Sequence, residues 1–281
     1  MTKFEKDLET VSVLPVAVIQ MTSGQDVDGN LKAAHALVAR AAKQGARLIL
    51  LPEMFACLGV SNQAVLAKTR FVEDDVLLTL STWAKELKVT LIAGSVPLAT
   101  DEESRVWAAS LVFDEDGKRI AQYNKIHLFD VDVADTKGRY RESDTFKPGY
   151  TPVTVDVEGV RIGLSICYDL RFPELFQQYQ KLGCDLVVVP SAFTFLTGQK
   201  HWEILLRARA VETQSFVLAS NQAGVHDDGR ETWGHSMVVS PDGVVLGESL
   251  NEGEDLVFVE LDISSLSKLR GAMPLLKHKR L

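Results

Sequence analysis

Three side chains able to take part in acyl transfer stand close behind apolar runs of strand length: Glu53, Lys125 and Cys167. In open α/β sheets, ligands bind beyond the carboxyl ends of the parallel strands, so Glu53 and Cys167 are expected to share one crevice. Lys125 joins them only if the antiparallel strand before it ends on the same side. Taken singly, such a cysteine is most often a buried core residue, and such a glutamate or lysine is usually a solvated charge.

Together, the three residues supply the parts of a thiol-based acyl transfer. A cysteine thiol with a pKa near about 8.5 is mostly protonated at neutral pH, so it needs a carboxylate to accept its proton and an ammonium group that favours negative charge. Attack on a carbonyl carbon creates an oxyanion. Lys125 and a backbone N–H after Cys167 are suited to stabilise that oxyanion in a dry pocket.

The elements that must position these residues alternate between apolar runs and helix-period segments, which indicates an α/β fold with parallel strands. Helices are predicted at 31–42, 76–87, 173–182 and 202–211, the first with Asn30 as its N-cap and Gly45 as its stop. Strands are predicted at 13–20, 47–51, 90–96, 107–113, 118–123, 160–166, 186–190, 216–221, 235–240 and 256–261. So many strands and so few helices favour two packed sheets with helices outside.

The rest of the chain shows no linker, repeat or change of composition, so residues 1–281 are expected to form one domain. The stretch Asp130–Pro148 lacks periodicity and is predicted to be a long loop, which in a compact domain is usually functional. Residues 262–281 are interpreted as a C-terminal extension at a subunit interface. There the apolar 274–276 precede a basic tail at 277–280.

The composition excludes several classes of protein. Of 281 residues, 46% are hydrophobic and 24% charged, which is typical of a globular chain. The net charge of −8 argues against nucleic acid and anionic membranes as partners, but a small amide substrate can still bind at a local basic site. The three cysteines form no CxxC pair, so neither a disulfide framework nor a sulfur-rich zinc site is indicated. With a charged N-terminus and no apolar run of roughly 20 residues, the protein is predicted to be cytoplasmic.

Three segments resemble the signature motifs of the nitrilase superfamily of carbon-nitrogen hydrolases: LPEMF around Glu53, YNKIHLFD around Lys125 and SICYDLRFPEL around Cys167. The resemblance runs from Val16 to about Leu261 and includes the spacing between the segments. It implies an α/β fold of the family's type, a four-layer αββα sandwich. It also implies a homodimer or higher homo-oligomer that associates through an outer helical layer.

The resemblance also implies roles for individual residues. Glu53 resembles the family's general base, Lys125 its oxyanion-stabilising lysine and Cys167 its nucleophile, with the Tyr168 amide as a second oxyanion donor. Glu142, in the segment RYRES, is similar to an additional glutamate that holds the lysine and orients water. The implied reaction forms a thioester, releases ammonia and ends with hydrolysis by a water that Glu53 activates. It requires no metal and no organic cofactor.

Longer matches, among them TGQKHWEILLRARAVETQ and WGHSMVV, resemble the Nit branch, which contains deaminated-glutathione amidase and omega-amidase. The implied substrate is a small amide whose far end carries a carboxylate, with deaminated glutathione preferred over α-ketoglutaramate. Arg171 is the candidate anchor for that carboxylate. The alternative for Arg171 is a structural ion pair with Glu174 or another carboxylate. Phe193 and Thr194 are expected to line the opposite wall.

Other functions stay open at this point. Nitrile hydrolysis uses the same three residues, so they do not separate a nitrilase from an amidase. A non-catalytic scaffold that retains the sandwich is an alternative of another class, although all three reactive positions are filled. The pair His201 and Glu203 lacks the PCxxC segment of a zinc deaminase, so His201 and His235 are interpreted as hydrogen-bonding groups. Cys57 and Cys184 are interpreted as structural.

Overall fold

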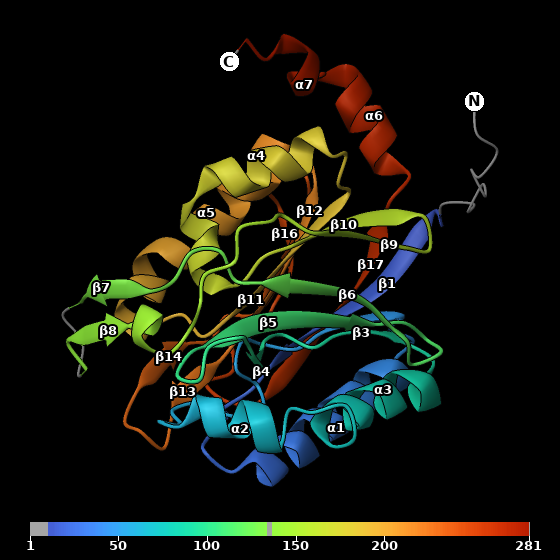
Figure 1. The fold of residues 1–281 in the computed structure, drawn as a ribbon. Coiled ribbons are helices and arrows are strands. Elements are labelled where there is room, and N and C mark those ends of the chain that lie inside the picture. Colours follow the sequence, from blue (N-terminus) through green and yellow to red (C-terminus); the bar gives the residue numbers. More distant parts are fainter. Residues whose placement is uncertain (1–10, 134–136, 281) are drawn as a thin grey trace.

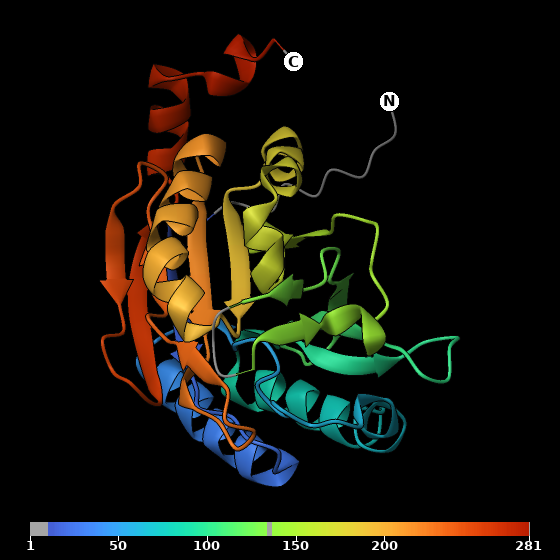
Figure 2. The same ribbon diagram turned by 90° about the vertical axis from the view of Figure 1, so that its left-hand side faces the viewer.

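Two β-sheets face each other in the computed structural model, and helices cover the outer side of each (Figure 1 and Figure 2). The structure describes residues 11–133 and 137–280. The two ends of the expected domain, including the last residue of the C-terminal extension, therefore lie outside the described residues. The arrangement is the expected four-layer αββα sandwich.

The first sheet contains β1 (Val13–Gln20), β2 (Leu48–Leu50), β3 (Thr90–Ile92), β4 (Val96–Ala99), β5 (Val106–Phe113), β6 (Arg119–Asn124) and β17 (Asp255–Asp262). Its order is β17-β1-β2-β3-β5-β4, and β6 pairs with β5. The pairs β1–β2 and β2–β3 are parallel, and β5–β6 is the expected antiparallel hairpin.

The second sheet contains β9 (Thr154–Val157), β10 (Val160–Leu164), β11 (Leu186–Ser191), β12 (Phe216–Asn221), β15 (Met237–Val239) and β16 (Val245–Glu248). Its order is β16-β15-β12-β11-β10-β9, with β10, β11 and β12 parallel. Two small hairpins stand apart: β7 (Asp130–Asp132) with β8 (Arg139–Arg141), and β13 (Ala223–Val225) with β14 (Glu231–Trp233).

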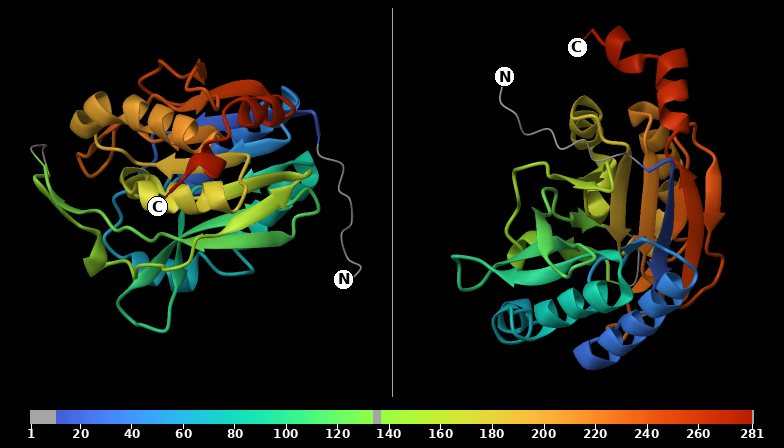
Figure 3. Two further views of the ribbon diagram at one scale, coloured as in Figure 1. Left: turned by 90° about the horizontal axis from the view of Figure 1, so that it is seen from above. Right: turned by 90° about the vertical axis from the view of Figure 1, so that its right-hand side faces the viewer.

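The helices divide between the two sheets. Three of them, α1 (Val27–Lys43), α2 (Gln63–Thr69) and α3 (Val76–Leu87), lie on the first sheet, and α4 (Pro173–Lys181) and α5 (Phe195–Thr213) cover the second. After β17, α6 (Ser265–Ala272) and α7 (Leu275–His278) lead away from the sandwich (Figure 3). Within the described ranges, no helix is both long and apolar enough to cross a membrane.

Alternation along the strands explains why the central strands are apolar on both faces. In β1, Leu14, Val16 and Val18 belong to the core between the sheets and beneath α4 and α5. Ala17 and Ile19 belong to the core beneath α1 and α3. Because successive side chains of a strand point to opposite faces, a strand covered on both sides reads as a continuous apolar run. This packing determines where each strand ends. It therefore determines the positions of the reactive residues, which follow the strand ends.

The predicted start of the first helix is wrong by one turn. The helix begins at Val27 with Asp26 as its N-cap. Asn30 lies inside the helix, where its side-chain amide donates to the backbone carbonyl of Ala56. A tertiary contact therefore uses the side chain that the sequence pattern assigns to capping. Gly45 lies just beyond the C-terminus with a φ of 98°, as expected of a glycine stop.

Three other predicted elements differ from the observed ones. The stretch 130–148 contains β7, β8 and the short 3-10 helix η1 (Glu142–Asp144), although residues 134–136 lie outside the described part. The strand expected at 90–96 is interrupted at Gly94, whose φ is 41° and whose Cα closely approaches the backbone of Pro52. A Cβ would collide there, so the interruption requires glycine. The helix expected at 202–211 begins earlier, at Phe195.

Candidate active site

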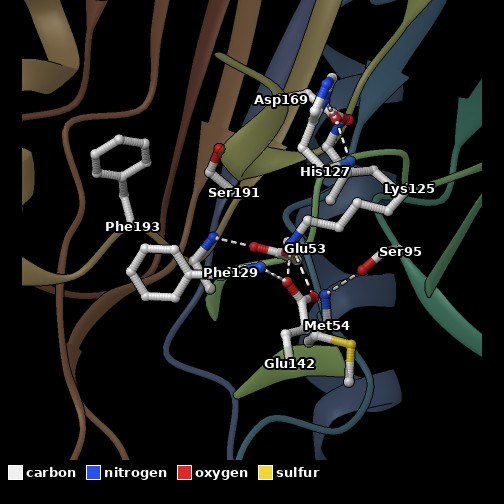
Figure 4. Close-up of polar contacts among 12 residues, drawn as sticks. Glu53, Met54, Ser95, Lys125, His127, Phe129, Glu142, Asp169, Ser191 and Phe193 are labelled. Carbon is white, nitrogen blue, oxygen red and sulfur yellow. Dashed lines mark hydrogen bonds and ion pairs between the residues drawn. The ribbon is translucent and has the colours of Figure 1, made fainter. Parts of the chain in front are cut away.

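Glu53, Lys125 and Glu142 form one hydrogen-bonded group (Figure 4), and together with Cys167 they line one pocket. Nζ of Lys125 donates to Oε1 of Glu53 at 2.7 Å. It also lies 2.8 and 2.9 Å from the two carboxylate oxygens of Glu142. These four side chains are called the polar floor below. The prediction that Glu53 and Cys167 share one crevice is confirmed, and the arm that carries Lys125 ends on their side.

Backbone groups hold the two carboxylates in place. Oε2 of Glu53 accepts from the N–H of Ala192, which directly follows β11, at 2.8 Å. Oε2 of Glu142 accepts from the N–H of Phe129 at 2.6 Å. Each carboxylate thus bonds Lys125 and a main-chain donor from a different element. A carboxylate fixed from two sides keeps its orientation through the reaction.

The backbone has a left-handed conformation at Cys167 in the polar floor and at Met54, the residue after Glu53. Cys167 has a φ of 47° and opens the 3-10 turn η2 (Cys167–Arg171) directly behind β10. Met54, next to Glu53, has a φ of 53°, and its N–H donates to Oγ of Ser95 at 3.0 Å. A residue other than glycine held in this region costs of order 1–3 kcal/mol, and such strain is concentrated at functional sites.

Asp169 connects the lysine and cysteine segments. Its Oδ2 accepts from the Tyr123 hydroxyl at 2.7 Å and from the Ile166 N–H at 2.8 Å. Its Oδ1 accepts from the His127 N–H at 3.0 Å and lies 2.7 Å from His127 Nδ1. This fully buried carboxylate therefore ties the chain on both sides of Lys125 to the residue before the cysteine. Sequence reasoning missed it, although an ionisable residue two positions after a candidate nucleophile was an available signal.

The pKa values in the polar floor follow from burial and charge together. Burial by itself would lower the pKa of Lys125, but the carboxylates of Glu142 and Glu53 outweigh it and hold that pKa well above its usual range. Burial raises the pKa of Glu142, while Lys125 opposes the rise. The raised pKa favours the ammonium form of Lys125 between the two acidic side chains.

Burial, and then the Glu53 carboxylate, raise the pKa of the Cys167 thiol well above its usual value. Lys125 and the N–H of Ala192 act in the opposite direction without cancelling the rise. The resting cysteine is therefore a thiol and not a thiolate. To act as a nucleophile, such a thiol would have to lose its proton during the attack, so it would need a base within reach.

The pocket above the polar floor has a volume of about 420 Å³, within the usual range for small-molecule sites. Its lining holds more basic than acidic side chains. The basic ones are Lys125, Lys137, Arg139, Arg141, Arg171 and Arg230, and the acidic ones are Glu53, Glu142 and Asp228. In a chain with a net charge of −8, this local excess of positive charge favours an anionic ligand.

Arg171 lies in the pocket wall beside the cysteine turn. Its guanidinium stands 5.0 Å from the centre of the Phe193 ring, and its Nη1 lies 3.2 Å from Nδ1 of His201. Among the described residues, no carboxylate approaches it within ion-pair distance, so the alternative pairing with Glu174 is not observed. Thr194 lines the pocket as well, at the start of α5.

The two histidines have ordinary hydrogen-bonding surroundings. Burial, and then the positive charge of Arg171, lower the pKa of His201, so its neutral ring accepts from the guanidinium. Nδ1 of His235 lies 2.6 Å from Oε1 of Glu248. In the part of the chain that the structure describes, no group of three or more His, Cys, Asp or Glu side chains is arranged to hold a metal ion.

Comparison with known proteins identifies the family. Residues 15–271 match the carbon-nitrogen hydrolase family. The chain belongs to this family. This carbon-nitrogen hydrolase is 38% identical to the deaminated glutathione amidase of Yersinia enterocolitica, over 94% of the chain and 92% of that protein. It is 38% identical to the omega-amidase NIT2 of Mus musculus, over 96% of both chains. It is 41% identical to the NitFhit fusion protein of Drosophila melanogaster but spans only 57% of its length.

Solved structures agree with the sandwich architecture of this carbon-nitrogen hydrolase. The NitFhit protein of Caenorhabditis elegans superposes with a TM-score of 0.89 at 38% identity, over 96% of this chain and 66% of that one. Nit3 of Saccharomyces cerevisiae, a member of the nitrilase superfamily, gives 0.86 at 31% identity, over 97% and 98%. An amidase from Nesterenkonia sp. AN1, in which acrylamide has added to the active-site cysteine, gives 0.76 at 29%, over 92% and 98%. The expected superfamily and fold are confirmed.

Proposed function

We propose that this enzyme hydrolyses an amide of a small carboxylate-bearing acid through a thioester on Cys167. One observation carries the proposal: a buried thiol, a carboxylate and an ammonium group meet under a pocket whose charge is locally positive. The relatives named as deaminated glutathione amidase and omega-amidase support the same reaction type.

In the first half of the reaction, Glu53 accepts the thiol proton as Sγ of Cys167 bonds to the amide carbon. The carbonyl oxygen becomes an oxyanion, to which Lys125 and the Tyr168 N–H donate. Protonation of Glu53 weakens its ion pair with Lys125 and so frees an ammonium N–H when the oxyanion forms. Collapse of the intermediate breaks the C–N bond, and Glu53 returns the proton to the leaving nitrogen.

In the second half, Glu53 takes a proton from a water whose oxygen attacks the thioester carbon. The oxyanion forms again on the same donors, the C–S bond breaks, and the proton returns to Sγ. Glu142 acts through Lys125, because it holds the ammonium group in place while Glu53 changes its charge. No atom of the protein is altered over the full cycle.

The acyl half of the substrate is assigned to the wall that contains Arg171. A guanidinium in contact with aromatic rings, and without a carboxylate partner among the described residues, is suited to bind a carboxylate in two parallel hydrogen bonds. Phe193 and Thr194 cover the apolar part of the same acyl chain. A dicarboxylic acyl group such as 2-oxoglutaryl satisfies this arrangement.

The expected release of ammonia holds only for primary amides. Glutathione contains no primary carboxamide. Hydrolysis of its deaminated form at the amide between the 2-oxoglutaryl group and the cysteine therefore releases cysteinylglycine. α-Ketoglutaramate has the same acyl group and releases ammonia. The two candidate substrates therefore share one product, 2-oxoglutarate, and differ only in the leaving group.

The test follows 2-oxoglutarate from both substrates with the wild type and with Cys167→Ala. We expect turnover by the wild type, preferentially of deaminated glutathione, and loss of at least about 10⁴-fold in kcat for the variant. Cys184→Ala is the matched control, because Cys184 is also buried and burial raises its pKa to about 12, but it lies outside the pocket. A mass increase of one acyl group on Cys167 identifies the thioester.

Other outcomes select the alternatives. Preference for α-ketoglutaramate identifies an omega-amidase, and hydrolysis of nitriles with amides untouched identifies a nitrilase. A protein that binds these compounds without turnover, and whose Cys167 never becomes acylated, is the scaffold of the other class. In that case the proposed function is wrong.

We also propose that the protein is a homodimer. The outer face of α5 exposes Leu196, Ile204 and Val211, the second of them at 67%, and α6 and α7 extend from the same side of the sandwich as α4. Apolar side chains repeated along one exposed helix favour a protein contact. Light scattering of the purified protein should give a mass of twice the 31.0 kDa of one chain. The Ile204→Asp variant should give the mass of a single chain.

A further inference from the structure

The guanidinium of Arg230 also lines the pocket. Arg230 lies in the turn between β13 and β14, and its guanidinium is 5.4 Å from the centre of the Tyr140 ring. Its Nε is buried and has no hydrogen-bond partner among the described residues. Its Nη2 forms a long ion pair with Oδ2 of Asp228 at 3.6 Å, beyond hydrogen-bond distance. A buried donor left unpaired in this way is a candidate for a ligand contact.

The neighbouring basic residues are occupied or exposed. Arg141 donates to both carboxylate oxygens of Asp132, at 2.9 and 3.1 Å, and to the carbonyl of Val131 at 3.0 Å. Lys137 pairs with Asp228 at 2.8 Å. Arg139 is exposed on β8. Arg230 therefore combines a packed position with donors that the described residues do not use.

An aromatic wall connects this position to the site of reaction. The ring of Tyr168, next to the cysteine, is 5.0 Å from that of Phe129, which is 5.1 Å from that of Tyr140. Arg230 is in contact with the last of these rings. The hairpins that contribute Tyr140 and Arg230 lie at one end of the molecule (Figure 1). An extended dipeptide, at about 3.3–3.6 Å per residue, would extend about 7 Å along this wall.

We infer that Arg230 binds the terminal carboxylate of a peptide-like leaving group. The inference rests on the proposed function and assigns the two ends of one substrate: Arg171 takes the carboxylate of the acyl half, and Arg230 that of the amine half. Planar guanidinium groups bind carboxylates in two parallel hydrogen bonds. A leaving ammonia is about the size of a water molecule and needs no such subsite, so this end of the pocket selects dipeptide amides.

The kinetic test combines removal of the Arg230 guanidinium with removal of the terminal carboxylate of the substrate. Wild type and Arg230→Gln are each given deaminated glutathione and its analogue with a C-terminal carboxamide, and 2-oxoglutarate is measured. We expect the variant to lower kcat/KM for the acid about 10- to 100-fold, mainly through KM. The loss for the carboxamide should be several times smaller. Equal losses for both compounds would contradict the inference.

Two arginine variants serve as controls. Arg139→Gln removes one charge from the same pocket, so it measures the general electrostatic effect. Arg119→Gln removes an arginine that pairs with Glu73 at 3.0 Å outside the pocket. Both should change the preference for acid over carboxamide by less than Arg230→Gln does. A larger carboxylate-specific loss with Arg139→Gln would assign the subsite to that residue and overturn the inference.

A binding measurement separates this inference from the proposed function. Cysteinylglycine and cysteinylglycinamide are titrated into the Cys167→Ala protein by calorimetry, so no turnover is needed. The acid should bind at least about 10-fold more tightly, and Arg230→Gln added to that protein should remove the difference. If the wild type hydrolyses neither substrate but this difference appears, only the proposed function fails. If turnover is found without the difference, only the subsite fails.

Discussion

The polar floor of the pocket is buried and internally hydrogen-bonded, whereas the basic side chains at its rim are more exposed to water. Lys125 and Glu53 in the floor are only 1% and 5% exposed, and they are bonded to each other and to their surroundings. In the basic rim, defined as Lys137, Arg139, Arg141 and Arg230, the first two residues are exposed and the two others are partly buried. Water reaches most of these charged groups and screens them, although Nε of Arg230 is buried.

Under the proposed function, this difference separates the residues assigned to the reaction from those assigned to the choice of substrate. A buried ion that loses its partner is strongly destabilised, so the floor tolerates one arrangement only. An exposed arginine changes its partner at little cost, so the rim can be altered without disturbing the fold. We expect substitutions in the floor to affect kcat and stability together, and substitutions in the rim to affect KM alone.

Lys125→Met should have the largest effect. It leaves Glu53 and Glu142 buried side by side, so the free energy of unfolding should fall by about 3–5 kcal/mol and kcat by at least about 100-fold. Without Lys125, one of the two buried carboxyl groups, Glu53 or Glu142, should keep its proton in the folded protein. In the unfolded chain the same carboxyl group is ionised at neutral pH. The stability of the variant should therefore rise as the pH falls from 7 towards 5.

Urea denaturation at several pH values measures this effect of Lys125→Met. Lys147→Met is the control, since Lys147 pairs with Asp101 and Glu102 on the surface and should matter little for stability. A stable Lys125→Met protein with unchanged kcat would show that the polar floor is not the centre of the reaction.

Arg171→Gln should raise KM for α-ketoglutaramate about 10- to 100-fold, because it removes the guanidinium assigned to the acyl carboxylate. The effect on an uncharged amide of similar length should be several times smaller. Steady-state kinetics with both amides checks the difference. If both lose equally, Arg171 supports the pocket wall without binding the carboxylate.

Asp169→Asn tests whether the link between the lysine and cysteine segments positions the floor. Its amide nitrogen would face N–H donors, so we expect the free energy of unfolding to fall by about 1–3 kcal/mol. The fall in kcat should exceed any change in KM. Asp132→Asn, in an exposed ion pair with Arg141, is the control. Lost stability with unchanged kcat would make the role of Asp169 structural only.

Ionic strength should have the smallest effect. Raising NaCl from 0.05 to 0.5 M shortens the screening distance, so KM for an anionic amide should rise about two- to threefold while kcat stays constant. Arg139→Gln should reduce this dependence, since it removes one exposed charge of the basic rim. A salt effect on kcat as large as that on KM would break the distinction between floor and rim.

The sequence pattern predicts the parts of the fold that depend on local burial. β1 and β12 have the predicted bounds, and α3 and α4 lie where their apolar stripes place them, because strand and helix periodicity record which faces are covered. The first turns of α5 were missed because the run from Thr197 to Lys200 is polar or glycine and interrupts any apolar stripe. The β7–β8 hairpin was missed because its strands are only three residues long and half exposed.

The sequence by itself determined that a cysteine, a carboxylate and an amine stand behind strands, because apolar runs end at the edge of a sheet. Only the tertiary structure decided that Lys125 points to the same edge, since that depends on the pairing of β6 with β5 across the sheet. Ala192 bonds Glu53, Asp169 bonds Tyr123 and Arg230 contacts Tyr140 through approaches of residues far apart in the chain. Such contacts leave no local periodicity, because they form only when both sheets are packed.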